Sequence, residues 1–117
     1  HPWRTSDGGN WTVHDPDGEL IIIPAATGLK CQLESQSGYS VTGCEFTAED
    51  IDIYFEQLDE ALTLVDPNQL NTFKGTYSQG APLDTDLLRE WLQRLQPYID
   101  AGQVEWKTID EIVEMVP

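Results

Sequence analysis

Positive charge is the scarcest property of this 117-residue sequence. Asp and Glu together number 21 against six Lys and Arg, and the formal net charge at pH 7 is −15. A field of this sign repels the phosphates of nucleic acids and anionic lipid headgroups, so nucleic-acid binding is not expected. The acids are spread along the chain and only three lysines occur. This balance predicts an acidic, solvated surface and favours an extracellular or cell-surface setting.

Long apolar runs are also missing, since the longest is LIIIPAA at residues 20–26. This run is far shorter than the roughly 18 apolar residues of a membrane-spanning helix, so a soluble chain is predicted. The sequence has no signal peptide and no initiator methionine, which indicates a removed leader or a piece of a larger protein. Its hydrophobic content of 39% is enough to bury a core in a chain of at most one domain.

Cysteine is limited to two residues, Cys31 and Cys44. They lie in two short strand-like runs around a Ser-Gly turn, so a disulfide between them would close a small loop. Such a bridge is worth about 3 kcal/mol in the chain-entropy model. The disulfide is predicted if the protein is exported and is disfavoured in a reducing cytosol. A zinc site on this pair is not predicted, because the sequence places no further ligands nearby.

Motifs of several enzyme classes are absent from the sequence. No Gly-x-Ser-x-Gly nucleophile elbow, glycine-rich phosphate loop or His-Glu-x-x-His occurs. The acidic stretch 15–19 departs from the calcium loop, which needs Gly at its sixth position and Glu at its twelfth, so a β-turn is predicted there. His1 and His14 are the two histidines, and with the terminal amine they form a minor candidate for binding copper.

The sequence does contain a regular succession of strand and helix signals. The β-branched run Glu19–Pro24 predicts a strand covered on both faces. Residues 28–46 are predicted to be a hairpin insertion that holds the two cysteines. Residues 70–77 and 104–107 predict two further short strands. The order strand, helix, strand, helix, strand, helix is typical of parallel strands with crossover helices and predicts an α/β fold.

Three helices are predicted from capping signals and apolar spacing. The first begins at the capping box Thr47–Asp50 and ends at Pro67. The second runs from about Asp84, and Pro97 is expected to kink or end it. The third begins at the capping box Thr108–Glu111. The side chains expected to face the core are Ile51, Tyr54, Phe55, Leu58, Leu62 and Val65 in the first helix, Leu87, Leu88, Trp91, Leu92 and Leu95 in the second, and Ile112, Val113 and Val116 in the third.

The four tryptophans occur in two kinds of sequence context. Trp91 lies in a predicted helix and Trp106 in a predicted strand, and both are expected to belong to the core. Trp3 and Trp11 lie in polar, turn-rich sequence beside Arg4. Aromatic rings in such a place either stack on sugar rings or anchor the loop. Trp3 and Trp11 are therefore candidate substrate-binding residues.

Two stretches carry a resemblance to a known family. The segment LLREWLQRLQPYIDAGQVEWKTIDEIVEMV is similar to the C-terminal end of the polysaccharide deacetylases, which are carbohydrate esterases. PWRTSDGGNW followed by GELIIIPA is similar to the mid-domain loop and strand of that family. The resemblance implies the C-terminal half of a (β/α)-barrel domain. It also implies a metal-dependent removal of acetyl groups from polysaccharide, with the metal ligands and the base in an N-terminal half.

Carried over to this sequence, the resemblance assigns Arg4 to orienting a catalytic carboxylate and Trp11 to the sugar groove. The family's late Leu-x-His, a proton donor, has no counterpart, because residues 70–80 read LNTFKGTYSQG. The chain alone is therefore expected to be catalytically silent. A divalent metal such as zinc is expected only with the missing N-terminal half or a second subunit, and polysaccharide is the expected ligand. The alternative is a self-contained, secreted, acidic α+β binding or structural module.

Overall fold

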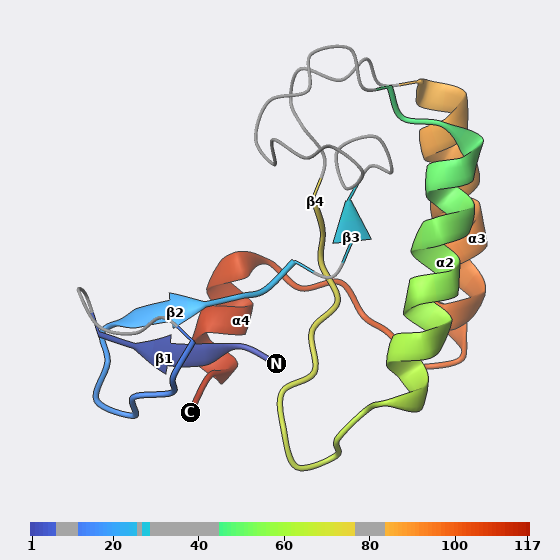
Figure 1. Cartoon of the computed structure of the whole chain (residues 1–117). Helices are drawn as coiled ribbons and strands as arrows, with labels where there is room; N and C mark the ends of the chain where they lie inside the picture. Colours follow the sequence, from blue (N-terminus) through green and yellow to red (C-terminus); the bar gives the residue numbers. More distant parts are fainter. Residues whose placement is uncertain (7–11, 26, 29–44, 77–83) are drawn as a thin grey trace. The chain divides into compact units, whose positions relative to one another are not determined.

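The protein, a computed structural model, is described over residues 1–6, 12–25, 27–28, 45–76 and 84–117. The chain divides into two units, each assembled from separate stretches of sequence. Unit 1 comprises His1–Pro24, Val65–Thr72 and Trp106–Pro117, and unit 2 comprises Ala25–Leu64 and Phe73–Glu105. Figure 1 shows the elements of both units along the chain.

Helix α2 spans Ala48–Thr63 and begins at the predicted capping box. The Thr47 hydroxyl accepts the Asp50 N–H, and the Asp50 carboxylate accepts the Thr47 N–H at 2.8 Å. These two bonds satisfy donors that a helix start otherwise leaves without partners. The predicted start is confirmed. The predicted end at Pro67 is wrong, because the helix ends at Thr63 and Val65 lies exposed beyond it.

Helix α3 spans Thr85–Asp100, with the Asp84 carboxylate accepting two N–H groups of the first turn. The helix continues through Pro97, which therefore does not end it. Pro97 and Gln93 are both exposed, so water can reach the carbonyl that loses its helical donor to the proline. After the C-cap Ala101, Gly102 has a φ of 71°, which is a conformation that glycine adopts without strain.

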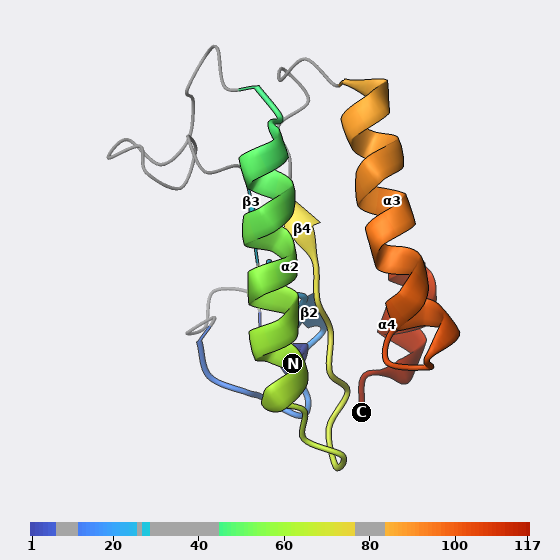
Figure 2. The same cartoon turned by 90° about the vertical axis from the view of Figure 1, so that its right-hand side faces the viewer.

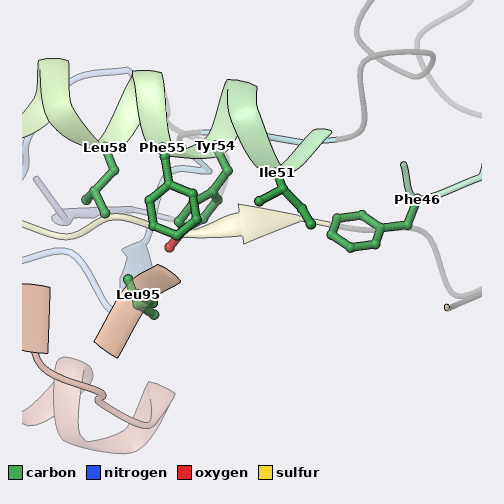
Figure 3. Close-up of a cluster of buried hydrophobic side chains, with 6 residues drawn as sticks. All are labelled: Phe46, Ile51, Tyr54, Phe55, Leu58 and Leu95. Carbon is green, nitrogen blue, oxygen red and sulfur yellow. The ribbon is translucent and has the colours of Figure 1, made fainter. Parts of the chain in front are cut away.

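The core of unit 2 forms where these two helices meet. Figure 3 shows four side chains of α2 pointing away from the helix on the side of β4, with Leu95 of α3 close by. The buried hydrophobic side chains of this cluster are Phe46, Ile51, Tyr54, Phe55, Leu58 and Leu95. The predicted α2 stripe is confirmed in its central residues. In α3 the stripe is narrower than predicted, because Leu92 is 44% exposed.

Aromatic contacts centred on Tyr54 give this core its geometry. The Tyr54 ring lies edge-on to Phe55, Phe73 and Trp91, with ring centroids 5.2, 5.1 and 5.3 Å away. Edge-to-face pairs at such distances are favourable beyond the area that they bury. The predicted core position of Trp91 is therefore confirmed. Phe73 comes from the segment that leads into β4, so the cluster ties a strand to both helices.

Polar contacts join the outer sides of α2 and α3, which lie side by side in Figure 2. Arg94 donates to Asp52 at 2.7 Å and places its guanidinium over the Phe55 ring, 4.5 Å from the centroid. The Tyr98 hydroxyl donates to the Asp59 carboxylate at 2.6 Å. This hydrogen bond to Asp59 raises the pKa of Tyr98, because it favours the protonated phenol.

Strands are short in unit 2. Strand β3, Thr27–Gly28, pairs in parallel with β4, Gly75–Thr76, and α2 lies between them in the chain. Strand β4 falls inside the stretch 70–77 for which a longer strand was predicted. Within the described ranges this pair joins two residues of each strand, and no further parallel strand accompanies it there.

The strands of unit 1 form an antiparallel hairpin. Strand β1, Trp3–Thr5, pairs with β2, Leu20–Ile22, so that Trp3 lies opposite Ile22 and Thr5 opposite Leu20. The Gly18 N–H donates to the Asp15 carbonyl at 3.0 Å, which closes the predicted β-turn. The Ser6 hydroxyl donates to the Asp15 carboxylate, and this bond, with one from the Asp17 N–H, lowers the pKa of Asp15.

Gly18 allows a close approach of the two arms of this hairpin. A Cβ atom at this position would overlap the backbone of Thr5, which is itself almost completely buried. The neighbour is main chain and cannot rotate away as a side chain would. Only glycine therefore fits at this point of the hairpin.

The predicted partial barrel is wrong. Among the described residues the structure has three helices, the antiparallel pair β1–β2 and the short parallel pair β3–β4, with no series of strand–helix repeats. The run Glu19–Pro24 forms one arm of an antiparallel hairpin that is exposed at Glu19 and Leu20 and half-buried from Ile21 to Pro24, and not a strand covered on both faces. Residues 104–107 form no strand, because the Gln103 and Val104 N–H groups bond to the Tyr98 carbonyl and turn the chain back onto the end of α3. Most of the predicted hairpin insertion at 28–46 lies outside the described residues.

Candidate binding surface on unit 1

Helix α4, Ile109–Met115, is a short helix secured by its first turn. The Thr108 N–H and hydroxyl donate to the Glu111 carboxylate at 2.7 and 3.0 Å, and the Glu111 N–H donates back to the Thr108 hydroxyl. The predicted capping box is confirmed. The bond from the Thr108 N–H, followed by that from its hydroxyl, lowers the pKa of Glu111. Because so short a helix is marginal in water, these bonds stabilise it where propensity alone would not.

Four apolar side chains of α4 and its C-cap form two pairs with i, i+4 spacing, and Met115 is a fifth apolar side chain outside both pairs. Ile112 and Val116 form the inner pair, in which Val116 is only 6% exposed. Ile109 and Val113 form the outer pair and are 55% and 38% exposed. Trp106, three residues before Ile109, is 60% exposed. The predictions that Val113 faces inward and that Trp106 belongs to the core are therefore wrong.

We call the exposed pair Ile109 and Val113, together with Trp106 in the segment before the helix, the outer face of α4. Around the helix axis, the 3.6-residue period places Asp110 and Glu114 next to Ile109 and Val113. Both acids are exposed. The outer face is thus apolar side chains bordered by negative charge.

Unit 1 leaves other large apolar side chains exposed as well. Val13, Leu20, Val65 and Met115 are all exposed, whereas Val116 is the one hydrophobic side chain of unit 1 that is buried in the described part of the chain. In the described part of unit 1, exposed apolar side chains are therefore not confined to α4.

Arg4, the predicted orienting residue, bonds to main-chain oxygens. Its Nε donates to the Pro117 oxygen at 2.8 Å, and its guanidinium also reaches the Gly18 carbonyl at 3.5 Å. These contacts tie the hairpin to the segment that follows α4. The predicted orientation of a catalytic carboxylate by Arg4 stays a prediction.

Trp3 and Arg4 do not share a face of β1. They are consecutive residues of one strand, and consecutive side chains point to opposite faces. Trp3 is half-buried. Its proposed role in binding sugar stays a prediction, and Trp11, the other candidate, lies outside the described residues.

The remaining candidates concern metals and disulfides. His1 and His14 are both exposed. Among the residues that the structure describes, no group of three or more His, Cys, Asp and Glu side chains is arranged to hold a metal ion. Cys31 and Cys44, the predicted disulfide pair, lie outside the described residues. Within the same described ranges, no helix is both long and apolar enough to cross a membrane.

Comparison with known proteins assigns the chain to no family: it matches no protein-family model, no curated protein and no solved structure. The resemblance to polysaccharide deacetylases therefore stays a prediction.

The outer face of α4 was not predicted, because the sequence of so short a helix does not show which of its apolar side chains are covered. Ile112, Val113 and Val116 lie close enough in sequence to predict one inward stripe, although Val113 is 38% exposed. Trp106 stands between Glu105 and Lys107 and two residues after Val104, which is the apolar–polar alternation of a half-buried strand. Its exposure therefore has no signal in the sequence.

Proposed function

We propose that the chain is a protein-binding module that contacts its partner through the outer face of α4. The observation that carries this proposal is the exposure of Ile109 and Val113 on α4, and of Trp106 in the segment just before it, while Val116 is already buried. A contiguous exposed apolar surface with a polar border is characteristic of an interaction site. Tryptophan is among the side chains that contribute most to such contacts.

Preorganisation of the surface supports the proposal. The reciprocal bonds of Thr108 and Glu111 hold the first turn of α4, and the Arg4–Pro117 bond holds the segment after its last turn. Side chains on a helix that is fixed at both ends lose less conformational freedom when a partner binds. The acidic net charge is compatible with a binding role and disfavours nucleic acid as the partner.

The test is site-specific photo-crosslinking in the organism that encodes the protein. A photoreactive benzoylphenylalanine replaces Trp106 in one variant and Leu92, an exposed residue of α3 in unit 2, in a matched control. We expect a discrete crosslinked product from position 106 only, and we expect the purified partner to bind the isolated chain in a fixed ratio. Equal crosslinking from both positions, or none from position 106, would contradict the proposal.

A further inference from the structure

We infer that the partner seated on the outer face of α4 is a basic amphipathic helix, with apolar side chains on one side and Lys or Arg beside them. This inference rests on the proposed function and adds the chemistry of the partner. It follows from the pattern of apolar side chains, from the charges that border them and from the net charge of the chain.

The apolar pattern fits one helix laid along another. Ile109 and Val113 stand one helical turn apart on α4, and Trp106 adds an exposed aromatic side chain two residues before the N-cap Thr108. An exposed i, i+4 pair of this kind suits contact with the apolar side of a second helix. The exposed fraction is largest at Trp106 and decreases through Ile109 to Val113. The partner must therefore bring apolar side chains for about two helical turns, with the largest contact at Trp106.

The charges that border the outer face of α4 indicate that the partner carries positive charge. Asp110 and Glu114 follow the outer face around the helix, and Glu105 precedes Trp106 in the chain. Lys107 is the one basic residue of the segment 105–117. A partner with Lys or Arg beside its apolar stripe is attracted electrostatically to this border, whereas an acidic partner is repelled.

A second copy of this chain fits the surface poorly. Two copies would each bring a formal charge of −15, and symmetric pairing through α4 would bring two sets of Asp110 and Glu114 to the same contact. Like charges placed together at a contact lower affinity and suppress the pairing. The charge of the chain therefore favours a cationic partner over self-association.

The experiment uses the full chain labelled with ¹⁵N and three synthetic helical peptides of one design. The first has a Leu stripe flanked by Lys, the second replaces Leu by Ser, and the third replaces Lys by Glu. We expect saturable shifts of the amides of residues 106–116 with the Leu–Lys peptide, and much weaker binding of the other two. Raising the salt concentration from about 0.01 M to about 0.15 M shortens the screening distance from about 30 Å to about 8 Å and should weaken the Leu–Lys complex.

Variants of the chain separate the apolar part of the contact from the charged part. W106A should weaken Leu–Lys binding roughly tenfold, which is typical of an anchor residue. The double variant Asp110→Asn, Glu114→Gln should weaken binding and also reduce its salt dependence. Leu92→Ala changes an exposed apolar residue of unit 2 and should leave binding unchanged. Far-UV circular dichroism of each variant checks that the helices remain.

Several results would overturn the inference. Equal affinity for the Ser–Lys peptide would mean that charge alone is recognised, and equal affinity for the Leu–Glu peptide would mean that charge is irrelevant. Concentration-dependent dimerisation that protects Trp106 would identify a second copy as the occupant. If position 106 crosslinks to a partner while the Leu–Lys peptide fails to bind, the proposed function stands and this inference is wrong.

Discussion

In unit 2 the buried hydrophobic side chains belong to one cluster that joins α2 and α3, whereas in unit 1 Val116 is the one buried hydrophobic side chain of the described residues. The geometry of unit 1 comes instead from polar contacts. These contacts are the capping box at Thr108, the turn at Asp15 and the hydrogen bond from Arg4 to the Pro117 oxygen. The two regions show how one chain combines an aromatic core with a surface held mainly by hydrogen bonds.

This difference has a direct thermodynamic meaning. Burial of apolar area is the dominant favourable term in folding, whereas a single hydrogen bond adds only about 1 kcal/mol net. We therefore expect the amides of α2 and α3 to exchange more slowly with solvent than those of the β1–β2 hairpin and α4. Apolar side chains that stay exposed for a partner contribute no burial energy to the folding of unit 1, so we expect unit 1 to be less stable than unit 2.

Phe55→Ala should break unit 2 and have the largest effect. The Phe55 ring is buried, stacks on Tyr98 and lies under Arg94, and Tyr54 lies edge-on to it, so its removal leaves a cavity and three lost contacts. We expect the free energy of unfolding to fall by about 3–5 kcal/mol, measured by urea denaturation. Leu92→Ala is the matched control and should change stability by no more than about 0.5 kcal/mol. Similar losses in both variants would refute the assignment of the core.

Gly18→Ala should break unit 1 while sparing unit 2. The new methyl group overlaps the Thr5 backbone, and strain of this kind costs about 1–3 kcal/mol. We expect the amides of β1 and β2 to lose protection from hydrogen exchange, while those of α2 keep theirs. Glu19→Ala, at the exposed neighbouring position, should leave the hairpin intact. Unchanged protection of β1 and β2 in the Gly18 variant would contradict the close approach of Gly18 to the Thr5 backbone.

The two capping boxes offer a matched pair of variants, one in each unit. Loss of a threonine cap costs about 1 kcal/mol. Thr47→Ala should lower the stability of unit 2 by this amount with α2 still helical, because the core holds it. Thr108→Ala should unwind α4, seen as carbon chemical shifts of residues 109–115 moving toward coil values. Thr63→Ala, which removes no N-cap, is the control. If α2 and α4 fray to the same extent, the contrast between the units is wrong.

The smallest expected effect is on the pH dependence of α4. The pKa of Glu111 is lowered in the folded chain, so its stabilising contribution is present above the unfolded pKa and is lost as pH falls through the folded pKa. We expect the Glu111 carboxyl carbon signal to titrate below the ordinary range for Glu, and Thr108→Ala to raise its midpoint. Thr47→Ala should leave this midpoint unchanged. A Glu111 midpoint at the ordinary value in the unaltered chain would contradict the capping geometry.

The helices were predictable because their signals are local. Each predicted helix start depends on four consecutive residues, which are Thr47–Asp50 in one case and Thr108–Glu111 in the other. The apolar spacing is equally local, because Ile51, Tyr54, Phe55 and Leu58 repeat with the helical period. Pairing of strands was not predictable in the same way. Trp3–Thr5 lies in turn-rich sequence and becomes a strand only through its partner Leu20–Ile22, so the antiparallel hairpin was mistaken for a component of a parallel sheet.

The candidate site could be predicted only in part for a related reason. The capped helix of residues 109–115 was predicted, but which of its apolar residues are covered depends on neighbours that are distant in the chain. Arg4 is a candidate because of the family resemblance, whereas its hydrogen bond to Pro117 is seen only in the folded structure. Side-chain partners at such separations leave no periodic signal in the sequence.

The hydrogen bond between Arg4 and Pro117 also bears on the order of folding. It joins residues 113 positions apart, and closing an open loop of this length costs about 4 kcal/mol in chain entropy. Unit 2 lies entirely within that loop in the sequence, because it runs from residue 25 to residue 105 and excludes only 65–72. Folding of unit 2 shortens the chain that remains to be closed. We therefore expect the hairpin and α4 to meet last, with unit 2 already formed.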